Sequence, residues 1–282
     1  MNPEARTTAS YVELPPAPGL VDHVRTVWVQ TTGTVPYVQR HLPTGGAELH
    51  WPIGGPPRLL GPLTGPRVEV IPAATTLLGV RFHPGAPLLI PGGVGDLRDQ
   101  RVPLDELGHR WVDRLGEAIA RAATPRAALR VLQDFLLRRV RTAAPDPLVR
   151  AAVRLLMPWT PRDVGAVADH LGLSASQFRR RCLGAVGTGP KSLQRTLRFQ
   201  GFLALAQAGA TATGRRGADG MAGLAVDVGY ADQAHLSREV RRLTGLTPGG
   251  LLGADVDRCS CGHDHTASYA PFLVGRRPQV PR

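Results

Sequence analysis

Lysine is almost absent from this chain of 282 residues: Lys191 is the only one, so the other basic residues are arginines. The three cysteines are too few, and odd in number, for a disulfide framework, which favours a reducing compartment. No segment approaches the roughly 18 consecutive apolar residues of a membrane helix, and the first residues lack a signal-peptide pattern. We therefore expect a cytoplasmic protein that does not insert into membranes.

Motifs of the common enzyme classes are also missing. The sequence has no G-x-S-x-G, Walker or H-E-x-x-H pattern, and its 22 acidic residues form no evident catalytic pair. We expect a protein that is not an enzyme. An enzyme with a site in the N-terminal domain is the weaker alternative.

The charge that is present is positive, and it is concentrated in the second half of the chain. The formal net charge is +12, and residues 145–253 alone hold 14 basic and 7 acidic residues. Clustered cations displace the counterions condensed on nucleic acid, so this segment favours a polyanionic partner. The excess of arginine over lysine could equally reflect a GC-rich genome, so the charge needs support from a motif.

Hydrophobic patterning divides the chain into three parts. Short β-type runs at 24–30, 37–41, 47–51 and 75–82 predict a small β-sandwich or barrel. Apolar residues at four-residue spacing over 107–119 and 129–140 then predict two antiparallel helices, whose stripes offer a surface for self-association. The fold class is thus α+β, with a mainly β domain and two helices at 1–144, an all-α domain at 145–253 and a flexible tail at 254–282.

The all-α domain contains a repeated pattern. Thr160 and Pro161 predict a helix start, Gly172 a helix end, and Ser174 the cap of a second helix. In that second helix a step of 100° per residue buries Phe178 and the thiol of Cys182 and turns the arginines at 179 and 180 outward. A long apolar helix at 193–208 follows, and then a flexible loop at 209–220.

The same pattern returns 58 positions later. Asp232 replaces Ser174 as the cap. The residues after the second helix also correspond, since Gly187 and Pro190 in the first unit match Gly245 and Pro248 in the second. The positions expected to be buried are Leu236, Val240 and Leu243, and those expected to face outward are Ala234, Ser237, Arg238 and Arg241. Two helix-turn-helix units joined by a linker helix account for the repeat.

The residues of this repeat resemble the AraC family of transcription regulators. The matching segments are LGLSASQFRRRC, GTGPKSLQRTLR and AVDVGYADQAHLSREVRRLTGLTP, with Arg195 and Arg198 at two of the motif's arginine positions. The resemblance implies a sequence-specific regulator that binds double-stranded DNA through two major-groove segments, with RNA polymerase, a small-molecule effector and a second copy of the chain as further partners. The implied DNA-binding residues are Ser176, Gln177, Arg179, Arg180, Gln233, Ala234, His235, Arg238 and Arg241.

Two other clusters could hold a metal ion. In the tail, Cys259, Cys261, His263 and His265 offer two thiolates and two imidazoles, which suit zinc or copper. The spacing is not that of a zinc finger, so incidental residues in a flexible tail are the alternative, and a metal-binding or metal-responsive protein is the alternative function. In the first domain, His41, Glu48, His50 and His83 do not match the cupin spacing, and we expect them to have structural or surface roles.

Overall fold

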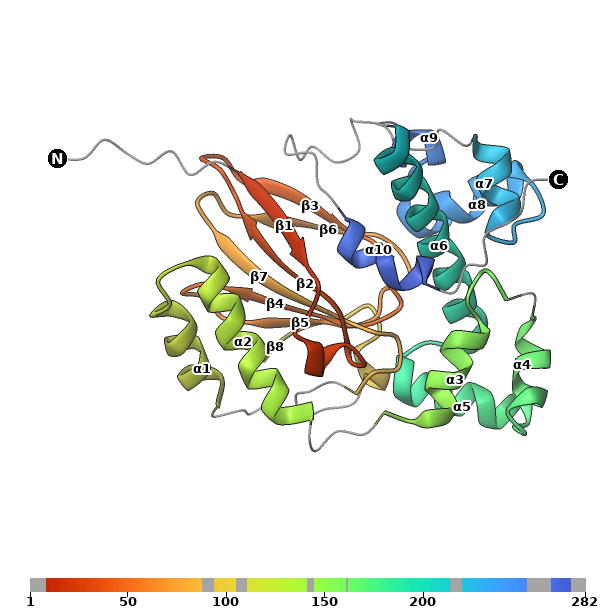
Figure 1. Ribbon diagram of the computed structural model, residues 1–282, viewed down its shortest axis with the longest axis horizontal. Coiled ribbons are helices and arrows are strands. Elements are labelled where there is room, and N and C mark those ends of the chain that lie inside the picture. The colour runs from red at the N-terminus through yellow and green to blue at the C-terminus, as the bar shows by residue number, and fades with distance from the viewer. Residues whose placement is uncertain are drawn as a thin grey trace.

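The computed structural model describes residues 9–87, 94–104, 111–140, 145–160, 162–213, 220–252 and 265–274. A β-rich part with two helices precedes an all-helical part, as the sequence predicts (Figure 1). No helix among the described residues is both long enough and apolar enough to cross a membrane.

Eight strands form the β-rich part. Their bounds are Ser10–Leu14 (β1), Val24–Thr31 (β2), Tyr37–His41 (β3), Glu48–Pro52 (β4), Arg58–Leu60 (β5), Arg67–Ile71 (β6), Thr76–Phe82 (β7) and Arg101–Pro103 (β8). Six of them pair antiparallel in the order β1-β2-β7-β4-β5-β8, while β3 and β6 form a separate pair. The four predicted runs became β2, β3, β4 and β7. The strands that the sequence did not reveal have only three to five residues each, too short for a clear alternation.

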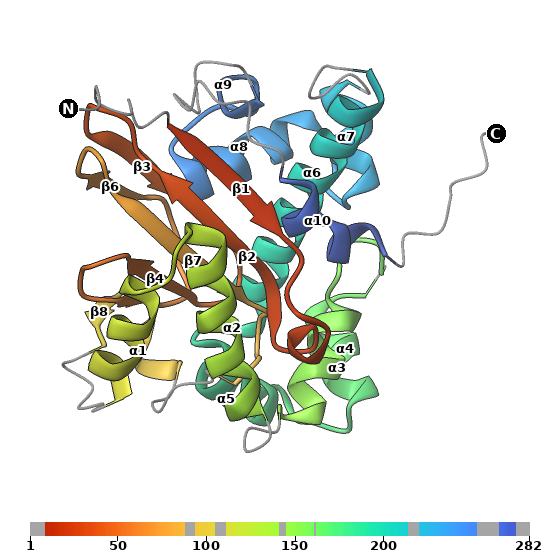
Figure 2. The same cartoon turned by 60° about the vertical axis from the view of Figure 1, so that its left-hand side comes forward.

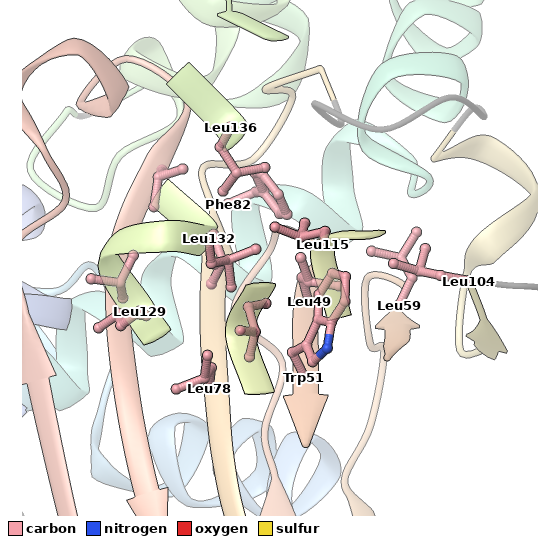
Figure 3. Packing of buried hydrophobic residues seen from close by; sticks show 14 of the residues in the cluster. Leu49, Trp51, Leu59, Leu78, Phe82, Leu104, Leu115, Leu129, Leu132 and Leu136 are labelled. Carbon is pink, nitrogen blue, oxygen red and sulfur yellow. The ribbon is translucent and has the colours of Figure 1, made fainter. Parts of the chain in front are cut away.

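Helices α1 (Trp111–Ala120) and α2 (Pro125–Val140) cover one face of the six-stranded sheet (Figure 2). Leu115, Leu132 and Leu136 lie against Leu49 and Phe82 in one buried cluster (Figure 3). The expectation that these helical stripes offer a self-association surface is therefore wrong. Sheet and helices have one apolar face each, and they bury these faces against each other.

The helical part contains α3 (Pro147–Leu155), α4 (Val164–His170), α5 (Ala175–Val186), α6 (Pro190–Thr213), α7 (Met221–Asp227), α8 (Gln233–Thr244), α9 (Pro248–Leu252) and α10 (Thr266–Leu273). Helix α6 continues through Gly209 to Thr213, where we expected a loop. Alternating alanines keep the helix propensity high there, and one internal glycine costs only about 1 kcal/mol. The remainder of the predicted loop, residues 214–219, lies outside the described residues.

Helix α6 contributes to two hydrophobic cores. Leu193 and Leu197, near its start, pack with Phe178 and Cys182 of α5. Phe199 and Phe202 pack instead with Leu236 and its neighbours in α7 and α8. The two lobes of the helical part, one around α3, α4 and α5 and the other around α7, α8 and α9, therefore both pack on α6.

Part of the tail, which the sequence predicts to be flexible, forms a helix in the structure. Helix α10 lies between α6 and strands β1 and β2 (Figures 1 and 2). Its Phe272 is buried in the core that surrounds Phe178, and its Ser268 is buried as well. Apolar residues in TASYAPFL gain a partner surface only when the β-rich and helical parts come together, so no local signal predicted this docking.

Gly79 provides a test of the sheet. It pairs with Trp28 of β2, and a Cβ atom added to it would lie 1.7 Å from Cε2 of the indole. Because the indole is buried and cannot move aside, we expect Gly79→Ala to lower the free energy of unfolding by about 3 kcal/mol or more. Urea unfolding measures this change. Gly65→Ala is the matched control, since no atom lies within 4 Å of its added Cβ; similar losses in both variants would contradict the packing described here.

Candidate nucleic-acid interface

The first two-helix unit consists of α4 and α5. Asp163 caps α4, its Oδ1 accepting a hydrogen bond from the Ala166 amide at 2.8 Å. The prediction that Thr160 is the cap is wrong, because α4 begins at Val164 and the nearer carboxylate satisfies its first amides. Gly172 has a φ of +66°, a left-handed conformation that lets the chain reverse between α4 and α5, as predicted.

Helix α5 starts with a reciprocal capping box. The Gln177 amide donates to Oγ of Ser174 at 3.2 Å, and the Ser174 amide donates to Oε1 of Gln177 at 2.9 Å. The helix ends at Gly187, whose φ is +75°. Start, length and end of the helix are therefore all encoded locally.

The second unit, α7 and α8, repeats this geometry. Oδ1 of Asp232 accepts a hydrogen bond from the His235 amide at 2.6 Å, so Asp232 caps α8 as predicted. Gly229 and Gly245 have φ values of +78° and +75°, matching Gly172 and Gly187 in the first unit. Helices α5 and α8 each have twelve residues, and α4 and α7 each have seven. The structure thus confirms the repeat that the sequence predicts.

The outward faces of α5 and α8 carry arginines. Ser176, Gln177, Arg179, Arg180, Gln233, Ala234, Arg238 and Arg241 are all exposed, whereas the opposite faces of both helices are buried. In the part of the chain that the structure describes, the side chains of Arg179, Arg180, Arg238 and Arg241 form neither a hydrogen bond nor an ion pair. Each unit therefore presents guanidinium groups that are free to meet an anionic partner.

Two of the predicted contact residues have local roles. The Gln177 side chain closes the capping box, so its carbonyl oxygen is already engaged. His235 is half-buried; its Nδ1 accepts a hydrogen bond from the Ala231 amide at 3.4 Å, and its ring meets Tyr230 edge-on at 5.2 Å. Only the other nitrogen of this imidazole, Nε2, is left to face a partner.

Arg181, adjacent to the exposed pair on α5, faces another direction. Its Nη1 lies 2.6 Å from Oδ2 of Asp146, whose other oxygen caps α3. The guanidinium therefore joins α5 to α3.

Helix α6 holds the second unit through two arginines whose partners the sequence did not reveal. Arg195 Nε lies 2.6 Å from Oε2 of Glu239 in α8, and both side chains are mostly buried. The guanidinium of Arg198 lies over the Tyr230 ring at 5.4 Å. The sequence motif marked both arginine positions, but Glu239 and Tyr230 lie more than 30 residues away and only the fold pairs them.

The β-rich part touches the C-terminal ends of α5 and α8. Arg40 of β3 donates to the Thr244 carbonyl at 3.3 Å. A Cβ atom added to Gly187 would lie 2.9 Å from the Val94 carbonyl oxygen. These contacts are made at the C-terminal ends of α5 and α8, whereas the exposed arginines 179, 180 and 238 lie in the first halves of the same helices.

The metal-site candidates are separated by the fold. His41, Glu48 and His50 come together, joined by Glu69 of β6, which sequence reasoning missed because a lone glutamate in a short strand gives no signal. His83 does not join them; its Nε2 lies 3.2 Å from the Val21 carbonyl oxygen. Of the tail cluster, Cys259, Cys261 and His263 lie outside the described residues, and Nδ1 of His265 lies 3.0 Å from Oε1 of Glu13.

Two family models match parts of the chain. Residues 12–103 match a domain of unknown function (DUF6597), and residues 167–253 match a helix-turn-helix domain. Among solved structures, ToxT from Vibrio cholerae O395 is similar to the chain at 9% identity and a TM-score of 0.44, covering 88% of this chain and 98% of that one. The same protein bound to (E)-4-(8-methylnaphthalen-1-yl)but-3-enoic acid gives 8% identity and a TM-score of 0.44, with the same coverage. No curated protein matches the chain.

Cys182 offers a test of the packing beneath α5. Its side chain is fully buried, and burial together with the nearby Asp146 charge raises the pKa of the thiol to about 12. Because only the thiolate is nucleophilic, we expect the folded protein at pH 8 to leave Cys182 unalkylated by iodoacetamide, and the unfolded protein to lose this protection. Peptide mass spectrometry measures both states. Rapid alkylation of Cys182 in the folded protein would contradict the burial.

Proposed function

We propose that this protein is a DNA-binding transcription regulator that reads two successive major-groove segments, one with each two-helix unit. The match of residues 167–253 to a helix-turn-helix domain supports this proposal. The observation that carries the proposal is the repetition of exposed arginines at equivalent positions of α5 and α8. Arg180 and Arg238 both lie on the exposed side of their helices, six residues after the caps Ser174 and Asp232. A guanidinium at such a position can donate two hydrogen bonds to a guanine edge.

Helix α6 supports a fixed separation of the two units. Its 24 residues span about 36 Å at 1.5 Å per residue, which is close to the roughly 34 Å of one duplex turn. Its residues belong to both cores, and Arg195 ties it to α8. With the separation fixed, the spacing between half-sites becomes part of recognition.

We expect Arg180→Ala and Arg238→Ala each to weaken binding to a selected operator by about 1 to 3 kcal/mol and to relax the preference at one base pair. Arg179→Ala, through loss of a phosphate contact, is expected to weaken all sequences alike and to lower the salt slope by about one. Titrations at two salt concentrations measure both effects. Arg130→Ala on α2 is the matched control, an exposed arginine outside the reading helices.

The same titration tests the spacing. Inserting about 5 bp between the half-sites turns one of them to the opposite side of the duplex, so binding is expected to fall to the level of a single half-site. Wild-type affinity in both arginine variants, or no effect of the insertion, would contradict reading by two units. DNA binding that survives while only the spacing effect is absent would leave a regulator with a single reading helix.

The finer properties of this regulator are also proposals. Its small-molecule effector would occupy a cavity of about 130 Å³ between the β-rich part and α6, lined by Arg25, Tyr37 and Gln200 among others. Arg25 is buried, and its Nε has no hydrogen-bond partner among the described residues, so an anionic group suits this cavity. RNA polymerase and a second copy of the chain remain expectations drawn from the family resemblance, and a cytoplasmic setting remains the expectation drawn from the sequence pattern.

For the tail, we propose that Cys259, Cys261, His263 and His265 bind zinc or copper. Two thiolates and two imidazoles are the ligands that these ions prefer. His265, the member within the described residues, has its Nδ1 next to Glu13, as ligating histidines often have next to a carboxylate.

Elemental analysis of the purified protein and of the double variant Cys259→Ser, Cys261→Ser tests the tail site. We expect the variant to lose about one equivalent of metal per chain, because the two serines remove both soft ligands. Equal metal content in the two proteins would contradict the tail site.

A further inference from the structure

Three potential metal ligands meet inside the β-rich part. His41 ends β3, His50 lies in β4 and Glu69 lies in β6, so three separate strands contribute. One ring nitrogen of each histidine and one oxygen of Glu69 lie within 4.8 Å of one another. Both histidines are buried, and their rings are 5.0 Å apart.

Each carboxylate in this region is oriented by an arginine. Arg101 holds Oε1 of Glu69, and Oε2 of the same carboxylate lies 3.2 Å from Nε2 of His41. In the same way, Arg81 Nε holds Oε1 of Glu48 at 2.8 Å, and Oε2 of Glu48 lies 3.4 Å from Nε2 of His50. Outer partners of this kind fix ligand orientation around metal ions in proteins.

His50 has an incomplete set of hydrogen bonds. Its Nε2 faces Glu48, but its Nδ1 is buried and has no hydrogen-bond partner among the described residues. An imidazole that donates through one nitrogen to a carboxylate keeps a lone pair on the other, and this is the form that binds metals.

We propose that His41, His50 and Glu69 bind one divalent transition-metal ion of the zinc class. Two imidazoles and one carboxylate are a ligand set that zinc accepts, and three protein ligands leave a fourth position open. Bond lengths of about 2.0 to 2.1 Å place neighbouring ligands of a tetrahedral ion about 3.3 Å apart, close to the distance between His41 and Glu69. Binding draws the third ligand inward and replaces the His41–Glu69 hydrogen bond.

The site has an entry path and differs chemically from the tail. His41 and Glu48 line the cavity between the sheet and α6, so an ion, and a ligand at its open position, can reach the cluster from there. The three ligands include no sulfur, whereas the tail candidate has two cysteines. The proposal does not rest on DNA binding, and a metal measurement tests it separately.

The test uses the full chain with Cys259→Ser and Cys261→Ser, which removes the thiolates of the tail. This background protein is dialysed against low-micromolar Zn²⁺ and analysed for bound metal, and Co²⁺ replaces Zn²⁺ for absorption spectroscopy. We expect about one equivalent per chain, and Co²⁺ bands typical of nitrogen and oxygen ligands without a thiolate charge-transfer band. His41→Gln and Glu69→Gln in this background are expected to lose the bound ion, whereas His83→Gln, the control outside the cluster, is expected to retain it.

Thermal unfolding without metal checks that each variant folds. If one of the two variants, His41→Gln or Glu69→Gln, does not fold, metal binding by the other tests the proposal. The Co²⁺ spectrum of the background protein tests it without either variant. No metal bound by the background protein would overturn the proposal. It would also be overturned by equal binding in the background protein and a folded cluster variant, or by loss of binding in His83→Gln alone.

Discussion

The sharing of α6 between two cores is the constraint on which the helical part depends. Besides α6, the first core takes buried residues from α3, α4, α5 and α10, and the second takes them from α7, α8 and α9. Leu193 and Leu197 complete the first lobe, and Phe199 and Phe202 complete the second. A change at one lobe that shifts α6 must therefore move the side chains that support the other.

Buried charged side chains join the β-rich part to helix α10. Arg81 lies 3.1 Å from Glu13 and contacts Ser268 of α10, while the Ser268 amide donates to the other Glu13 oxygen at 3.1 Å. Burial alone would raise the pKa of Glu13, but the hydrogen bond from His265 and the Arg81 charge hold it well below its usual range. A carboxylate with a lowered pKa stabilises the folded state above its unfolded pKa, so this joint weakens only when the solution becomes acidic.

The β-rich part contacts the helical part at the C-terminal ends of α5 and α8. Strand β3 carries both His41, next to the cavity, and Arg40, which holds the last turn of α8. Val94 lies in the same way against Gly187 at the end of α5. The β-rich part thus contacts α5 and α8 at their ends and leaves the faces that carry Arg180 and Arg238 exposed.

Local signals in the sequence determined the repeat. Caps at Ser174 and Asp232, left-handed glycines at 187 and 245 and the 3.6-residue apolar spacing act within one or two helical turns, so they could be identified without a structure and placed the exposed arginines correctly. Only the tertiary structure decided which strand each histidine would meet, that Arg195 would pair with Glu239, and that α10 would dock on the sheet. These contacts join residues that are far apart in the chain. Strand order and helix packing determine which residues meet, and a short segment of sequence contains no information about either.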